Sequence, residues 1–222
     1  MISKLFAVLI IAIGSVYGQT KISGKTDFVN RYIWRGADFG NSFSVQPTLA
    51  FSSGEFEAGF WGSYPFTNTS DGNEELDFSV SYSINSFSLL VTDYYFPNSG
   101  LKLGKLKTPG AHTLEAGLSY NGTKNFPLSF SGFVNLYNDE DNSMYLELNY
   151  STNVSDVNID FFLGGGNHIY TISGKFNLIN IGIKASKEIK ISDSFSLPVF
   201  SSYILNPNTE KDYLVFGIAF GF

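Results

Sequence analysis

Apolar and polar residues alternate strictly along most of this chain, and this pattern constrains the fold more than any other feature. After the first eighteen residues no stretch has helical spacing. Segments of about ten residues alternate with period two, separated by clusters of Gly, Asn, Asp, Pro and Ser. The first such segment spans 21–35, and in a later one Phe78 and Val80 alternate with Asp77 and Ser79. We count twelve such segments, which predicts an all-β fold of about 12 antiparallel strands.

The connections between these segments alternate in length. Short turns follow the second, fourth and eighth segments, at 52–54, 85–86 and 152–155. Long connections follow the third, fifth and ninth segments, at 65–74, 97–112 and 165–175. Barrels of the bacterial outer membrane have an even number of strands, short periplasmic turns and longer extracellular loops. The pattern therefore predicts a transmembrane antiparallel up-and-down β-barrel with both termini on the periplasmic side.

A secreted β-sandwich or a lipocalin-like barrel is the soluble alternative, with its apolar faces turned inward. Twelve strands of large apolar side chains are more than one small barrel can pack inside. Charged residues are only 15% of the chain, below the ~25% usual for a soluble domain, while aromatic residues reach 17%. Both observations favour the membrane barrel, with outer-membrane lipid and lipopolysaccharide as its surroundings.

The last segment ends in an alternating apolar series that closes on the C-terminal residue. Its members are Leu214, Phe216, Ile218, Phe220 and Phe222. An ending of this kind resembles the signal that the barrel-assembly machinery reads in outer-membrane proteins of Gram-negative bacteria. The resemblance implies that this machinery is a partner of the chain.

The N-terminal segment has the features of a secretory signal peptide. Lys4 precedes an apolar run over 5–13, and small residues surround a cleavage point after Gly18. The apolar run is shorter than the ~20 residues of a membrane-spanning helix. The chain therefore divides into a signal peptide, 1–18, and a single barrel domain, 19–222. It contains no Cys, and its net charge of −6 has the wrong sign for nucleic-acid binding.

Several short motifs resemble those of one family. The segments 32–36 (YIWRG), 60–63 (FWGS) and 93–97 (DYYFP), together with Gln46-Pro47, Glu75-Leu-Asp77 and Glu115, resemble the TorF-type porin family of bacterial outer-membrane proteins. The motifs cover about the first half of the mature chain. At one position the family tends to have YPG after the fifth strand, whereas this chain has Phe96-Pro97-Asn98. The resemblance implies an outer-membrane barrel with a pore role and no catalytic residues.

Charged residues within the strands fall on the face opposite the apolar one, which in a membrane barrel lines the lumen. A Lys or Arg at mid-depth on the lipid face costs ~2–4 kcal/mol. The predicted lumen residues are Lys25, Asp27, Arg31, Arg35, Glu55, Glu57, Glu75, Asp77, Asp93, Glu115, Glu147, Asp160 and Lys184. Acidic residues outnumber basic ones in this set, so we expect a channel for small hydrophilic solutes that prefers cations. Alternatively, the charges pair across the interior and plug a non-conducting structural or adhesion barrel.

The long connection at 97–112 contains Lys102, Lys105 and Lys107 among leucines and glycines. The sequence leaves three alternatives open for it. The segment folds inward and forms a basic constriction, it binds lipopolysaccharide phosphates outside, or it is a solvated extension of a hairpin.

An outer-membrane barrel hydrolase is the enzymatic alternative. It needs a Ser, a His base and an orienting polar group together at one rim. The histidines, His112 and His168, both fall in predicted extracellular loops, and no nucleophile motif accompanies them. The sequence therefore favours a protein that is not an enzyme.

Two further segments are weak candidates for ligand binding. Residues 139–141 (DED) match no calcium-loop spacing and are predicted to be a solvated turn. The glycines of 164–166 precede no helix, which argues against a phosphate-binding loop. No cofactor or metal is predicted.

Overall fold

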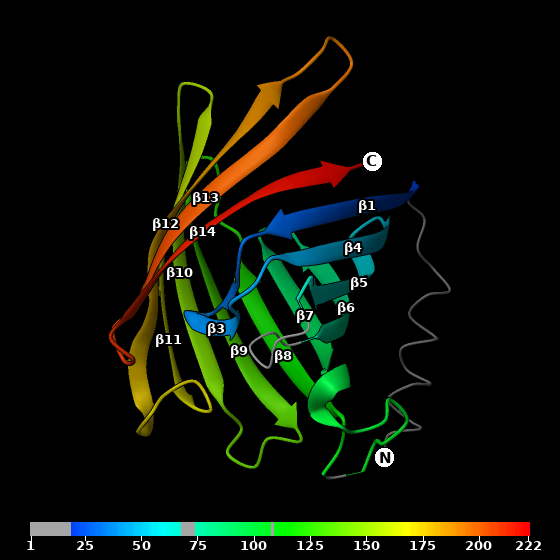
Figure 1. Ribbon diagram of the computed structural model, residues 1–222, viewed down its shortest axis with the longest axis vertical. Coiled ribbons are helices and arrows are strands. Elements are labelled where there is room, and N and C mark those ends of the chain that lie inside the picture. Colours follow the sequence, from blue (N-terminus) through cyan, green and yellow to red (C-terminus); the bar gives the residue numbers. More distant parts are fainter. Residues whose placement is uncertain (1–18, 68–73, 108) are drawn as a thin grey trace.

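The computed structural model describes residues 19–67, 74–107 and 109–222, in which twelve antiparallel strands close into a barrel (Figure 1). The barrel strands are β1 (Thr20–Val29), β4 (Ser44–Ser53), β5 (Phe56–Pro65), β6 (Glu75–Ile84), β7 (Phe87–Tyr95), β8 (His112–Tyr120), β9 (Leu128–Tyr137), β10 (Met144–Val154), β11 (Val157–His168), β12 (Gly174–Lys190), β13 (Ser196–Asn206) and β14 (Lys211–Gly221). Each strand pairs with its neighbour in sequence order, and β1 closes on β14. The predicted up-and-down barrel is confirmed. The predicted signal peptide, 1–18, lies outside the described residues.

The strands turn their large apolar side chains outward. Leu118, Leu214 and Phe216 are about half exposed or more, and on the same strands Glu115 and Val215 are buried inside. Polar residues such as Ser44, Asn135 and Ser202 also point inward and are buried. This orientation is the reverse of a soluble sandwich, and hydrocarbon around the barrel would satisfy it. In the described part of the chain, no helix is long and apolar enough to cross a membrane.

The two ends of the barrel differ in the length of their connections, as predicted. One end has the termini and the connections 54–55, 85–86, 121–127, 155–156 and 191–195. The other end has the connections 30–43, 66–74, 96–111, 138–143, 169–173 and 207–210. By analogy with outer-membrane barrels, we call these the periplasmic and the extracellular end.

The predicted long connection at 165–175 is wrong. Gly164, Gly165 and Gly166 lie within β11, and only 169–173 connects it to β12. A glycine run ordinarily marks a turn. Here a Cβ on Gly164 would lie 2.1 Å from the Tyr145 hydroxyl oxygen, so glycine makes room for a ring inside the barrel.

The predicted first strand over 21–35 is also wrong in extent. β1 ends at Val29, and the chain then turns into the barrel, where β2 (Tyr32–Trp34) and β3 (Ala37–Gly40) form a separate two-stranded sheet. Figure 1 shows β3 within the ring of strands. Arg35 and Gly36, between the paired Trp34 and Ala37, have φ of 50° and 75°. Positive φ at both central residues is the requirement of a two-residue type I′ hairpin turn. We call residues 30–43 the lumen hairpin.

The barrel closes through a short seam. β1 pairs with β4 over all ten of its residues but with β14 only from Lys25 to Val29. At one end of this seam the backbones of Gly24 and Phe222 exchange hydrogen bonds of 3.2 and 2.9 Å. At the other end Asn30 donates to the Leu214 carbonyl (3.1 Å) and accepts from the Phe216 amide (2.8 Å). The extracellular half of β14 pairs only with β13 and contacts β2 on its other side.

Candidate functional site in the barrel lumen

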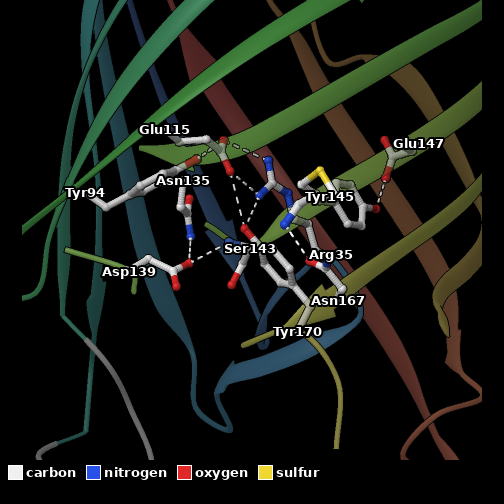
Figure 2. A network of polar contacts seen from close by, with 11 residues as sticks. Arg35, Tyr94, Glu115, Asn135, Asp139, Ser143, Tyr145, Glu147, Asn167 and Tyr170 are labelled. Atoms are coloured by element: carbon white, nitrogen blue, oxygen red, sulfur yellow. Dashed lines mark hydrogen bonds and ion pairs between the residues drawn. The ribbon is translucent and has the colours of Figure 1, made fainter. Parts of the chain in front are cut away.

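The tip of the lumen hairpin is joined to the opposite wall through Arg35. Its Nη1 donates to Oε2 of Glu115 at 2.5 Å and its Nη2 donates to Oε1 at 2.9 Å, which makes a bidentate ion pair (Figure 2). Arg35 also donates to the Tyr170 hydroxyl (2.6 Å), and the Tyr94 hydroxyl donates to Glu115 (2.9 Å). The side chains of Arg35 and Glu115 are only 8% and 2% exposed. The pair is therefore a buried contact between hairpin and wall.

Aromatic rings enclose the guanidinium group. Its central carbon lies 4.3 Å from the ring centroid of Trp34, 4.5 Å from that of Phe133 and 4.4 Å from that of Tyr145. An arginine over such rings gains cation–π attraction, which is stronger away from water. Phe133 and Tyr145 were not among the predicted site residues, but both fall on the polar face of their strands. A large ring on that face must pack against something inside the barrel, and this was the signal available in the sequence.

Gly36 brings the hairpin tip against the wall. A Cβ at this position would lie 1.8 Å from the backbone oxygen of Ile179, which is closer than any side chain can approach. The Gly36 carbonyl accepts a hydrogen bond of 2.9 Å from the side chain of Asn206. Backbone contact and left-handed φ therefore both require glycine here.

The rest of the hairpin packs on two sides of the lumen. Ile33 packs against a buried apolar cluster of Ile204, Tyr213 and Val215. On the other side the Tyr32 ring lies 5.3 Å from that of Trp61. Apolar packing on both sides makes the hairpin a fixed part of the interior rather than a loose loop.

Arg31 contacts residues of its own hairpin, and its guanidinium carbon also lies 5.4 Å from the ring centroid of Tyr213 on β14. It donates to Asn41 and lies 3.4 Å from Asp38. Arg31 and Arg35 were predicted to lie on the first barrel strand. Both instead belong to the hairpin, although both lie inside the barrel as predicted.

Several predicted lumen carboxyls are buried beside the hairpin. Glu75 and Asp77 are 1% and 8% exposed, and Glu75 accepts from the Tyr32 hydroxyl. Glu75 and Asp77 also hydrogen-bond to each other. Glu147 accepts from the hydroxyl of Tyr145 and from the amide of Asn180 (3.0 Å).

The remaining predicted lumen residues lie toward the periplasmic end. Lys25 pairs with Asp27 at 2.9 Å, and Asp160 accepts from Ser151 at 2.6 Å. The Lys184 ammonium lies 4.8 Å from the Phe200 ring centroid. Glu55 and Glu57 line a polar hollow of about 210 Å³ with serines of β4 and β6. The residues of this group therefore lie apart from the buried contacts at the hairpin tip.

Asp93 does not line the lumen, so this prediction is wrong. On β7, Phe87, Leu89 and Val91 are about half exposed, and Asp93 continues their outward face. Its carboxylate lies 2.9 Å from Nδ1 of His112. β7 has apolar residues on both faces, so its sequence does not specify which face turns inward.

The connection 96–111, which includes a short 3₁₀ turn η2 (Pro97–Ser99), does not fold inward. The Leu101 carbonyl accepts from Tyr95, and the Leu106 carbonyl accepts from Tyr137. The backbone of Gly110 exchanges hydrogen bonds of 3.2 and 2.9 Å with the side chain of Asn138. These contacts hold the segment at the outer side of the extracellular rim, so the hypothesis of a constriction by Lys102, Lys105 and Lys107 is wrong. The lumen hairpin narrows the interior instead.

The histidines do not form a hydrolase site in the described structure. Nδ1 of His112 faces Asp93, and Nε2 donates to the Leu103 carbonyl at 2.6 Å. Both ring nitrogens therefore have partners other than a serine hydroxyl. His168, the last residue of β11, lies 3.6 Å from Asp141, and His112 is the first residue of β8, so the predicted loop positions of the two histidines are wrong. Neither histidine has a serine among its contacts in the described residues.

Residues 139–141 form a turn closed by its own hydrogen bonds. Oδ2 of Asp139 accepts from the side chain of Asn135 (2.8 Å) and from the amide of Ser143 (3.1 Å). Partial burial by itself would raise the pKa of Asp139, but the hydrogen bonds from Ser143, Asn135 and Asp141 outweigh it and hold the pKa below its usual value. Across the described ranges, no group of His, Asp or Glu is arranged to hold a metal ion.

Comparisons with known proteins found similar solved structures but no matching family. No family model matches the chain, and no curated protein matches it. Among solved structures, the chain is similar to one reported in a study of the in-meso crystallization of membrane proteins, with a TM-score of 0.50, 8% identity and coverage of 90% of this chain and 83% of that one. Weaker likenesses are to an outer membrane channel from Pseudomonas putida F1 (TM-score 0.45, 11% identity, 92% and 94% covered) and to a porin (0.36, 9%, 92% and 100%). At these identities the first likeness bears on the fold alone.

Proposed function

We propose that this barrel, with polar groups inside and large apolar side chains outside, is an outer-membrane channel for passive diffusion of small hydrophilic solutes. In this proposal the channel prefers cations, and the lumen hairpin narrows it. Its resemblance to the TorF-type porin family and its predicted signal peptide are consistent with this location. The C-terminal series that ends at Phe222 would be read by the barrel-assembly machinery.

The acidic excess inside the barrel carries the proposal. Among the described inward-facing residues, Glu57, Glu147 and Asp160 have no cation within ion-pair distance, while Lys25 and Arg35 are already paired. Of the predicted lumen cations, Lys184 has no ion-pair partner in the described structure. Fixed carboxylates raise the local concentration of cations and repel anions.

Reversal potentials across planar bilayers in a KCl gradient test the preference. We expect the protein to conduct with a cation preference, and the double variant Glu57→Gln/Asp160→Asn to shift the reversal potential toward zero. Asp156→Asn/Asp193→Asn is the matched control, because it removes two exposed carboxylates from periplasmic turns and should leave selectivity unchanged. An anion-preferring current would contradict the proposal.

A non-conducting structural barrel is the second candidate, and the tight packing at the hairpin tip favours it. Tyr145, Glu115 and Ser143 are at most 2% exposed, so the described side chains around the hairpin tip are closely packed and shielded from solvent. An electrically silent protein that becomes conducting when the hairpin is displaced would support this candidate in place of the open channel.

A further inference from the structure

The connection 96–111 combines positive charge with exposed leucines. It contains Lys102, Lys105 and Lys107 and no acidic residue. All three lysines are exposed, and Leu103 and Leu106 between them are 55% and 56% exposed. Exposed leucines side by side with lysines are costly in water but suit the boundary between lipid headgroups and acyl chains.

The barrel holds this segment in a fixed place. Backbone carbonyls of the segment accept hydrogen bonds from Tyr95, His112 and Tyr137, at its beginning, middle and end. The rings of Tyr95 and His112 stack with centroids 5.4 Å apart. Tyr95 and His112 continue the outward faces of β7 and β8, so the segment lies at the outer rim, directly beyond the apolar belt.

We propose that residues 101–107 bind the phosphate groups of a phosphorylated lipid in the outer leaflet, with Leu103 and Leu106 against its acyl chains. The inference rests on the proposed outer-membrane location. Charge complementarity favours this occupant, because three ammonium groups lie within six residues and no carboxylate in the segment neutralises them. Each lysine near an anionic lipid surface strengthens the attraction several-fold.

The full mature chain in neutral detergent provides the test. The probe is bisphosphorylated hexa-acyl lipid A, and binding is measured by native mass spectrometry at several lipid concentrations. We expect Lys102→Gln/Lys105→Gln/Lys107→Gln to raise the dissociation constant at least about tenfold. The control Lys21→Gln/Lys124→Gln/Lys190→Gln removes three exposed lysines from the periplasmic end and should leave it unchanged.

Two further probes separate lipid from free phosphate. Fully dephosphorylated lipid A should bind at least about tenfold more weakly than the bisphosphorylated form. The acyl-free bisphosphorylated disaccharide should also bind more weakly than lipid A. In the variant Leu103→Ser/Leu106→Ser, the dissociation constants of the disaccharide and of lipid A should become equal. Equal binding of the acyl-free disaccharide and lipid A by the unaltered protein would overturn the lipid assignment. Equal weakening by the control lysine variant would overturn the assignment of the site.

Folding and channel function are checked on the same samples. The shift in gel mobility on heating and the far-ultraviolet circular dichroism should match the unaltered protein for every variant. Because the lysines lie outside the lumen, the lysine variant should keep the cation preference of the parent. Unchanged lipid binding by a folded lysine variant overturns this inference alone, whereas an anion-preferring parent that still binds lipid A overturns the proposed channel alone.

Discussion

At the scale of single residues, the Arg35–Glu115 pair should make the largest contribution to the stability of the interior. Removal of one partner from a buried ion pair leaves the other charge uncompensated and costs about 3 kcal/mol or more. We expect Arg35→Met and Glu115→Gln each to lower the free energy of unfolding by about this amount, and the double variant to lose less than the sum. Urea unfolding followed by tryptophan fluorescence measures the cycle. Additive losses would show that the two side chains do not interact.

The carboxylate of Asp139 makes a pH-dependent contribution. Its pKa is lowered in the folded protein, so its stabilising effect is present above the unfolded pKa of about 3.9 and is lost as the pH falls through the folded value. Asp139→Asn should therefore speed amide exchange at Ser143 at pH 7, and the difference from the parent should shrink as the pH falls below the unfolded pKa and the carboxylate becomes protonated. A difference that persists at low pH would assign the effect to shape rather than charge.

At the scale of secondary-structure elements, a single methyl group added at Gly36 should displace the lumen hairpin from the barrel wall. A Cβ at position 36 meets the Ile179 backbone at 1.8 Å, whereas at Gly174, also at positive φ (69°), it meets nothing within 4 Å. Gly36→Ala should therefore raise single-channel conductance and change the tryptophan emission, while Gly174→Ala adds only local strain of about 1 kcal/mol. Both tryptophans report on the hairpin, because Trp34 lies in β2 and Trp61 packs on Tyr32. Equal effects of the two substitutions would argue against displacement.

The sequence predicted the barrel strands well because lipid outside and polar groups inside impose one alternation on every strand. It did not predict the hairpin. Inside the lumen, β2 and β3 contact both polar and apolar side chains, so Tyr32 and Trp34 continue the alternation of β1 and the sequence shows no break where β1 ends. Arg35-Gly36 is also an unusual type I′ pair, where Asn-Gly is the common signal. Glu75, Asp77 and Glu115 could be assigned to the lumen from parity alone, whereas Asp93 could not, because β7 has apolar residues on both faces. Their partners could not, because Arg35 and Glu115 are 80 residues apart and meet only through the inward turn.

At the scale of the whole molecule, the seam between the first and last strands is the weakest part of the cylinder. β1 and β14 pair directly over five residues, and Asn30 extends the seam with two side-chain hydrogen bonds. Loss of both bonds should cost about 1–3 kcal/mol. Asn30→Ala should therefore speed amide exchange at Phe216 and Phe222 before other strands respond, and Asn153→Ala, an exposed position on β10, should not. Because closure joins strands almost 200 residues apart, opening at the seam should release the lumen hairpin that begins at Asn30, and the tryptophan emission should change together with exchange at the seam. Exchange at the seam without any change in emission would mean that the hairpin holds its place independently of barrel closure.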